Sequence, residues 1–342
     1  MKLFSHIYRF NLVIKVLYAL FPFSSQISAG ALICIFAFII PQNAYSGTDE
    51  TKAKPIIAVA SDGQDTIYVL TSEPGGIYIS RDAGQSWYRP EGGLPGSRLF
   101  SLTRSQDDRL FITSYEGVFS SADQGRSWSS LSESRNISRF YCTISETCVS
   151  VHWTRGLRWS SSKDEQDVPS QGDGVSSLTT QILVTEDGKL WASTLGEGVI
   201  YSRDEGRSWG FINDGLGNLV VLSLAWHPGT RTLFAGTLEG GVFKRKAEGP
   251  WIITSEGLPE FATVQALAMD TQGNLWAGTH GKGLFGSHDQ GLSWSSFPLR
   301  EDGEISVTSI THFRDKALVG TYAHGLYLAG PDRHSIESIR IP

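Results

Sequence analysis

The chain has 342 residues, a formal net charge of −6 and 40% hydrophobic residues, so it is long enough to bury one or two cores. Its apolar and aromatic content excludes disorder over most of its length. Many glycines and aromatic residues, with only 19% charged residues, favour turn-rich β-structure. The acidic balance argues against a nucleic-acid-binding surface.

The N-terminal segment has the composition of an export signal. Two apolar runs, Phe10–Phe23 and Ile27–Pro41, follow a basic start, and small residues at Ala44 and Ser46 precede Gly47. We expect cleavage before Gly47. The alternative is an uncleaved anchor, although Ile27–Pro41 is shorter than the roughly 20 residues that span a bilayer. The predicted organisation is a signal peptide over 1–46, a linker over 47–54 and one domain over 55–342. The protein is then exported, either periplasmic or secreted, and is not integral to the membrane once the signal is removed.

Two cysteines, Cys142 and Cys148, remain after the predicted signal. Apolar residues flank the short polar segment between them, so a β-hairpin would place the two side chains opposite each other. In an oxidising compartment we expect them to form a disulfide, and the alternative is a reduced pair. Their spacing is not Cys-x-x-Cys, which argues against a metal or redox site.

A repeat of about 42 residues runs through the chain, the length of one four-stranded propeller blade. Each unit has a glycine followed by an apolar residue and a short β-like run. The glycines are Gly76, Gly117, Gly156, Gly198, Gly241, Gly283 and Gly325. The pattern predicts an all-β fold, a seven-bladed β-propeller of four-stranded antiparallel blades. Ile56–Ala60 would be the innermost strand of the first blade and Ser335–Ile341 the outermost strand of the seventh, with no strand exchanged between the chain ends.

Four units share the pattern S-x-D-x-G-x-x-W after their third predicted strand. Its Asp, Gly and Trp residues are Asp82, Gly84 and Trp87; Asp123, Gly125 and Trp128; Asp204, Gly206 and Trp209; and Asp289, Gly291 and Trp294. The Asp can accept backbone N–H groups of the turn, the Gly can supply a positive φ, and the Trp offers an apolar face for packing. Four copies around a ring indicate a structural part rather than a catalytic site.

This pattern resembles the Asp-box (BNR) repeat of sialidase-like propellers, and the single exported ring also resembles photosystem II assembly factors. The photosystem II relatives use a box with two adjacent glycines, which no box here has. The resemblance implies that the boxes lie at the periphery, away from a binding face. True sialidases have six blades and an arginine triad that cannot be assigned here, so no sialidase catalytic residue is carried over. Xyloglucan-cleaving enzymes also carry Asp boxes but pair two propellers around a cleft.

Variable residues beside the recurrent glycines are the candidates for a binding face. They are Glu116, Trp153, Arg155, Glu197, Glu239, His280, Lys282, Tyr322 and His324. The aromatic and basic members fit a recognition surface. The three glutamates allow glycoside hydrolysis only if two of them flank one bond, and two histidines alone are too few for a metal site. Convergence of Glu116 and Glu197 with raised pKa values would favour an enzyme.

The predicted function is that of an exported, non-catalytic binding or assembly factor for an envelope or extracellular protein, without a cofactor or a metal. One alternative is a single-propeller glycoside hydrolase or carbohydrate-binding protein. A further alternative is a stable part of a larger envelope complex. We favour the third unit, which has the cysteine pair and Trp153 but no box, as a docking edge.

Overall fold

The computed structural model describes residues 54–72, 76–96, 98–143, 146–153, 155–161, 164–172, 178–246, 248–300, 304–332 and 335–342. They belong to the compact unit Gly47–Pro342. The predicted signal peptide, its cleavage site and nearly all of the predicted linker lie outside the described residues. Among the described residues, no helix has the length and apolar character that crossing a bilayer requires.

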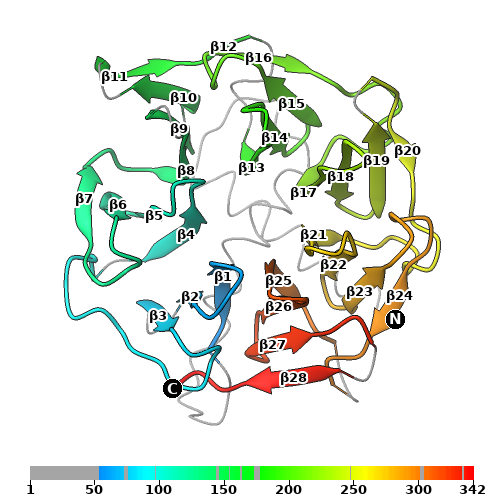
Figure 1. Ribbon diagram of the computed structural model, residues 1–342. Coiled ribbons are helices and arrows are strands. Elements are labelled where there is room, and N and C mark those ends of the chain that lie inside the picture. Colours follow the sequence, from blue (N-terminus) through cyan, green and yellow to red (C-terminus); the bar gives the residue numbers. More distant parts are fainter. Residues whose placement is uncertain are drawn as a thin grey trace, which may run out of the picture. The chain divides into compact units, whose positions relative to one another are not determined.

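Within this unit the strands form seven sheets arranged as blades around one axis (Figure 1), which confirms the predicted all-β seven-bladed propeller. Blade 1 contains β1 (Ile56–Ser61), β2 (Ile67–Thr71) and β3 (Gly76–Ser80). Blade 2 contains β4 (Leu99–Arg104), β5 (Leu110–Ser114), β6 (Gly117–Ser121) and β7 (Ser129–Ser132). Blade 3 contains β8 (Ile137–Cys142), β9 (Thr147–His152), β10 (Gly156–Ser161) and β11 (Asp164–Pro169). Blade 4 contains β12 (Gln171–Gly172), β13 (Thr179–Val184), β14 (Leu190–Thr194), β15 (Val199–Ser202) and β16 (Ser208–Phe211).

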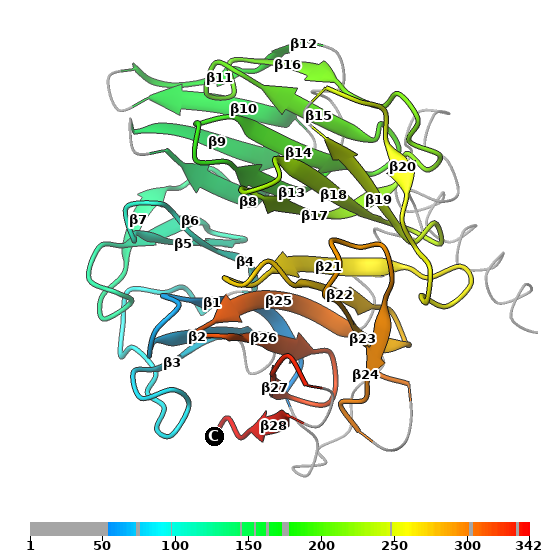
Figure 2. The ribbon, with the colours of Figure 1, turned by 45° about the vertical axis from the view of Figure 1, so that its right-hand side comes forward.

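The last three blades each have four antiparallel strands (Figure 2). Blade 5 contains β17 (Val221–His227), β18 (Thr232–Thr237), β19 (Val242–Lys246) and β20 (Ile252–Ile253). Blade 6 contains β21 (Val264–Met269), β22 (Leu275–Thr279), β23 (Gly283–Ser287) and β24 (Ser295–Phe297). Blade 7 contains β25 (Val307–Phe313), β26 (Lys316–Thr321), β27 (Leu326–Ala329) and β28 (Ile336–Ile339).

Two blades differ from the predicted four strands. In blade 1 only an isolated bridge between Ile79 and Tyr88 stands in place of the fourth strand. The cause is Pro90, which has no N–H to donate to β3. In blade 5 the residue at the same distance after the tryptophan is Thr254, and its N–H donates to Val242 O (2.8 Å). Blade 4 gains a fifth strand, because β12 pairs in parallel with β16.

The innermost strands share a β-bulge and hydrogen-bond across blade boundaries. The register with the second strand shifts between the first and third residues of β1, β4, β8, β13, β17, β21 and β25. A bulge of this kind raises the local twist. Side chains also hydrogen-bond to the backbone of the innermost strand in the next blade. Gln181 accepts from Leu224 N–H (2.8 Å) and donates to Leu224 O (3.2 Å). Backbone groups on the open edge of β17 are thus paired by a side chain of the preceding blade.

The ring closes by packing blade 7 against blade 1, without exchange of a strand. The first blade begins with β1 and the seventh ends with β28, as the sequence predicted. Thr308 donates to Ile56 O (2.8 Å), and Val59 N–H donates to Ser309 Oγ (3.1 Å). A buried cluster including Val69, Phe313 and Leu318 fills the junction. Hydrophobic packing and these side-chain hydrogen bonds therefore close the propeller.

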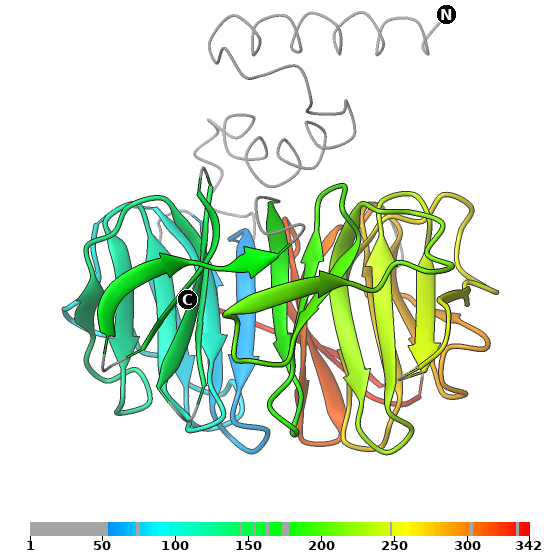
Figure 3. The ribbon, with the colours of Figure 1, turned by 90° about the horizontal axis from the view of Figure 1, so that it is seen from above.

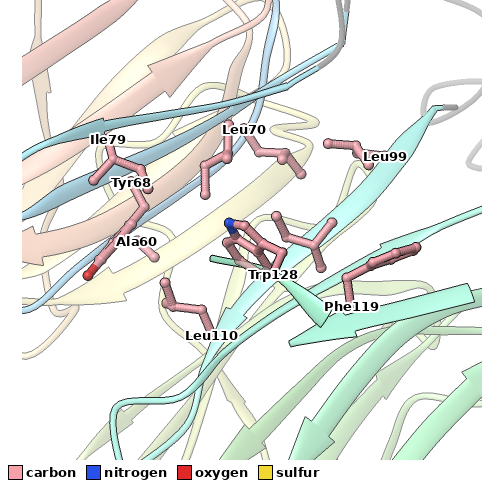
Figure 4. Packing of buried hydrophobic residues seen from close by; sticks show 10 residues of the cluster. Ala60, Tyr68, Leu70, Ile79, Leu99, Leu110, Phe119 and Trp128 are labelled. Atoms are coloured by element: carbon pink, nitrogen blue, oxygen red, sulfur yellow. The ribbon is translucent and has the colours of Figure 1, made fainter. Parts of the chain in front are cut away.

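Adjacent blades bury their apolar faces against each other. Figure 4 shows the junction of blades 1 and 2, where Leu70 and Ile79 from the first blade meet Leu110 and the indole of Trp128 from the second. Trp128 is 6% exposed. Because each core lies between two sheets, the stability of the ring depends on neighbouring blades stacking together.

Candidate functional site

The propeller has two different faces, seen edge-on in Figure 3. Since the strands of a blade alternate in direction, the turns between second and third strands share one face with the crossovers between blades. We call this the turn face. The four S-x-D-x-G turns lie at the opposite ends of the strands, together with the turns between first and second strands, and we call that face the box face.

The box turns are closed by hydrogen bonds within themselves. In the first, Ser86 N–H donates to the Asp82 carboxylate, Gly84 N–H to Ser80 Oγ (each 2.8 Å) and Trp87 Nε1–H to Gly84 O (3.2 Å). Both Ala83 and Gly84 have positive φ. A serine directly before each tryptophan donates its hydroxyl to the box aspartate: Ser86, Ser127, Ser208 and Ser293. This serine recurs in all four copies of the sequence pattern, so its role in the turn could have been predicted from its repetition.

These hydrogen bonds favour the ionised aspartate. The Ser127 hydroxyl and the Ser127 backbone N–H lower the pKa of Asp123 to about 2. Since the unfolded chain has a higher pKa, the ionised Asp123 stabilises the fold above about pH 4. That stability is lost as the pH falls toward about 2, where the folded protein also becomes protonated.

The Asp123→Asn substitution is therefore expected to lower the unfolding midpoint at pH 6 and to have little effect at pH 2. Thermal unfolding of both proteins across this pH range measures the difference. A constant difference between the two proteins at all pH values would contradict the assignment of the stabilisation to the carboxylate charge.

Every turn on the turn face is held by the same backbone hydrogen bond. The first residue of the turn donates its N–H to the carbonyl that precedes the innermost strand of the same blade, at 2.9–3.3 Å. The donors are Ser72, Tyr115, Trp153, Leu195, Leu238, His280 and Tyr322. The frame is therefore constant, while the side chain at this position changes from blade to blade. This is the arrangement expected of a rigid scaffold that presents variable contacts.

The recurrent glycines complete this frame. A threonine at the end of the second strand donates to the glycine carbonyl in blades 4 to 7, for example Thr279 to Gly283 O (2.7 Å). Six of the seven glycines, all except Gly76, have positive φ, a region that side chains with a Cβ rarely adopt. In blade 3 the buried His152 stands in place of the threonine.

Three aromatic side chains gather on the turn face between blades 2 and 3. The ring of Phe100 lies 4.7 Å from that of Tyr115 and 6.2 Å from that of Trp153, edge-on to both. Tyr115 is 51% exposed, Trp153 is half-buried, and the neighbouring Glu116 and Arg155 are exposed. We call Phe100, Tyr115 and Trp153 the aromatic cluster. Phe100 was not among the predicted residues, because it is the bulged residue of β4 and its direction depends on that register shift.

The three candidate glutamates occupy blades 2, 4 and 5. Blade 3 lies between Glu116 and Glu197. Burial raises the pKa of Glu197, whose Oε2 is buried without a hydrogen-bond partner. Glu239 is exposed, and its backbone N–H donates to Thr263 Oγ1 (3.1 Å). The turns that carry Glu116 and Glu197 are therefore not neighbours around the ring, whereas those of Glu197 and Glu239 are.

Of the two candidate histidines, His280 of blade 6 contacts a serine that precedes the innermost strand of blade 7. His280 Nδ1 is 3.3 Å from Ser306 Oγ, and Tyr322 N–H donates to Ser306 O (2.9 Å). Burial, followed by the charge of Arg300, lowers the pKa of His324. Lys282 is exposed on the same turn as His280. In the described part of the chain, no group of three or more His, Cys, Asp or Glu side chains is placed to hold a metal ion.

Cys142 and Cys148 form a disulfide across the β8–β9 hairpin. On the same hairpin, Thr147 donates to the carboxylate of Glu205 in blade 4 (2.8 Å). The hairpin that carries the disulfide is therefore hydrogen-bonded to the box turn of the next blade.

Comparisons with known proteins agree with the fold. A model of the two-component regulator propeller matches residues 261–281, and no curated protein matches the chain. The extracellular domain of BT4673 from B. thetaiotaomicron, described as a one-component system, superposes with a TM-score of 0.65 at 17% identity, over 82% of this chain and 39% of that one. YCF48 bound to D1 peptide gives 0.66 at 13% identity, over 83% and 94% of the two chains. An ancestral GH74 enzyme gives 0.63 at 15% identity, over 82% and 45%.

The similar structures thus include proteins of different activities, and this chain spans well under two thirds of two of them. At such low identity the likeness concerns the fold, and the resemblance to Asp-box repeats rests on the sequence pattern alone. The chain is a seven-bladed β-propeller whose turn face holds variable side chains in a constant frame.

Proposed function

We propose that the protein is an exported, non-catalytic propeller that binds a protein partner through its turn face. The observation that carries this proposal is the aromatic cluster. Tyrosine, tryptophan and arginine are the residues most enriched at binding hot spots, and Tyr115, Trp153 and the adjacent Arg155 lie together on one face. The peptide bound to the structurally similar YCF48 supports a protein partner.

A carbohydrate ligand is the second candidate function. Its supporting observation is Glu197, because burial raises the pKa of this carboxyl, as a general acid requires. Exposed aromatic rings can also stack on sugars. The separation of Glu116 from Glu197 by blade 3 favours the protein partner over a hydrolase.

The Trp153→Ala and Tyr115→Ser variants are expected to bind the partner about tenfold or more weakly, since truncating a central aromatic residue costs about 2 kcal/mol at a hot spot. Tagged wild-type and variant proteins are used to capture partners from an envelope extract, and the affinity of a recovered protein is then measured. Leu131→Ser is the matched control, because Leu131 is 49% exposed on the outer strand of blade 2.

Equal binding by Trp153→Ala and wild type would count against docking at the third blade. A glycan array on the same preparation separates the two candidate functions. Binding or cleavage of one glycan class, without a protein partner, would replace the proposal with the carbohydrate function and direct mutagenesis to Glu116, Glu197 and Glu239.

A further inference from the structure

Phe261 is an exposed aromatic residue in a backbone conformation that phenylalanine rarely adopts. Ala262 N–H donates to Pro259 O (3.1 Å), which closes a four-residue turn in the crossover from β20 to β21. Phe261 is the third residue of this turn, with φ of 56°, and its side chain is 71% exposed. Turns with positive φ at this position normally have glycine there. Among the described non-glycine residues with positive φ, no other is aromatic.

The surrounding backbone holds Phe261 in this conformation. Gly241 N–H donates to Ala262 O (3.0 Å), and His280 N–H donates to Thr263 O (3.0 Å). Glu239 N–H donates to the Thr263 hydroxyl (3.1 Å). Turns of blades 5 and 6 thus fix the segment directly after Phe261. The strained backbone of Phe261 is thus held by its surroundings, while the ring stays largely exposed. Such a conformation indicates that the ring contacts another molecule.

Acidic and apolar residues lie next to Phe261 in the chain and on the turn and the crossover of the preceding blade. Glu239, itself at φ of 55°, and Glu260 are both exposed. Leu219, 41% exposed, lies on the preceding crossover, and Leu238 N–H donates to the adjacent Val220 O (3.0 Å). We call Leu219, Glu239, Glu260 and Phe261 the acidic aromatic patch. The exposed cation Lys282 lies on the following turn, beyond His280.

We propose that the acidic aromatic patch binds a basic segment of a partner protein. An arginine or lysine side chain of that segment would lie over the Phe261 ring, within about 6 Å of its centre, as cation–π contacts require. Its charge would face the carboxylates of Glu239 and Glu260, and Leu219 would contact an adjacent apolar side chain. Two carboxylates beside an exposed ring favour a cation over a neutral sugar. The proposal rests on the proposed function only in taking the turn face as the protein-binding face.

The test uses the full-length chain and an array of extended peptides with a central arginine or lysine. Each arginine peptide is paired with one containing citrulline, which keeps the shape but removes the charge. We expect citrulline to weaken binding at least tenfold. Phe261→Gly is expected to weaken binding at least tenfold while leaving the thermal midpoint unchanged or raised, because glycine relieves the backbone strain. Leu292→Ser, at a 62% exposed residue of the box face, is expected to leave binding unchanged.

The proposal is overturned if citrulline peptides bind equally well, if Phe261→Gly retains full affinity, or if no basic peptide binds the wild-type chain. A clear fall in the midpoint of Phe261→Gly would also overturn it, since the phenylalanine would then be a structural residue. If a captured partner loses affinity for Trp153→Ala but not for Phe261→Gly, the proposed function stands and this inference fails. If both substitutions leave that partner's binding intact, both fail.

Discussion

Substitution of Gly257 by alanine is expected to lower the free energy of unfolding by about 2–5 kcal/mol, the sum of a left-handed backbone penalty and a steric overlap. Gly257 has φ of 88° and lies in the crossover after blade 5. A Cβ there would come within 2.1 Å of the Trp294 carbonyl oxygen, which is far too close for any side chain. Because Trp294 N–H donates to Glu256 O (2.8 Å), the backbone cannot move away without breaking the contact between blades 5 and 6.

Alanine substitutions at two other glycines separate the backbone penalty from the steric overlap. Gly283 has φ of 80° but open space where a Cβ would lie, and Gly92 has open space without a positive φ. Gly283→Ala should therefore lose only about 1–2 kcal/mol, and Gly92→Ala should change stability little. Urea unfolding of the three variants measures the series. Equal losses at Gly257 and Gly283 would show that the contact with Trp294 does not matter.

Truncation of Trp294 to alanine is expected to destabilise the fold by about 3–5 kcal/mol. This box tryptophan is 4% exposed and packs in a cluster with Phe234 of blade 5 and Leu275 of blade 6. Its Nε1–H donates to Thr254 O of blade 5 (2.8 Å). The substitution leaves a cavity between two blades and an unpaired carbonyl, so both packing and hydrogen bonding are lost.

Trp294→Phe should be milder, since it keeps most of the apolar surface and loses only the indole donor. The half-buried Trp153 is the matched tryptophan on the turn face, and its truncation should destabilise the fold less than that of Trp294. Thermal unfolding of the three variants provides the comparison. If Trp153→Ala destabilises as strongly as Trp294→Ala, the distinction between a packing tryptophan and a binding tryptophan is wrong.

The blade repeat could be predicted because its causes are local. Six of the seven recurrent glycines, Gly241 and Gly283 among them, adopt positive φ, which disfavours residues with a Cβ, so glycine recurs at blade spacing. The fourth strand of blade 1 was predicted wrongly, although Pro90 was visible in the sequence, because the repeat pattern outweighed a single proline. The structural role of Gly257 could also have been predicted, since a Gly-Leu pair recurs at blade spacing, at Gly215-Leu216 and Gly257-Leu258.

The candidate site was less accessible to sequence reasoning. Trp153 and Glu116 were predicted for the binding face from their position in the repeat, but the direction of Phe100 depends on a bulge that only the strand register reveals. Phe261 was missed because phenylalanine carries no preference for positive φ, so nothing local marks its turn. The spacing of Glu116 and Glu197 depends on the order of blades around the ring, which sets how far apart two turns lie.

The most direct test of the central claim is site-specific photo-crosslinking in the cell envelope, with the reactive amino acid at position 115 on the turn face or at position 292 on the box face. The account predicts that position 115 crosslinks to a defined protein and that position 292 does not. Crosslinks to the same protein from position 292 alone, or equally from both positions, would contradict binding through the turn face.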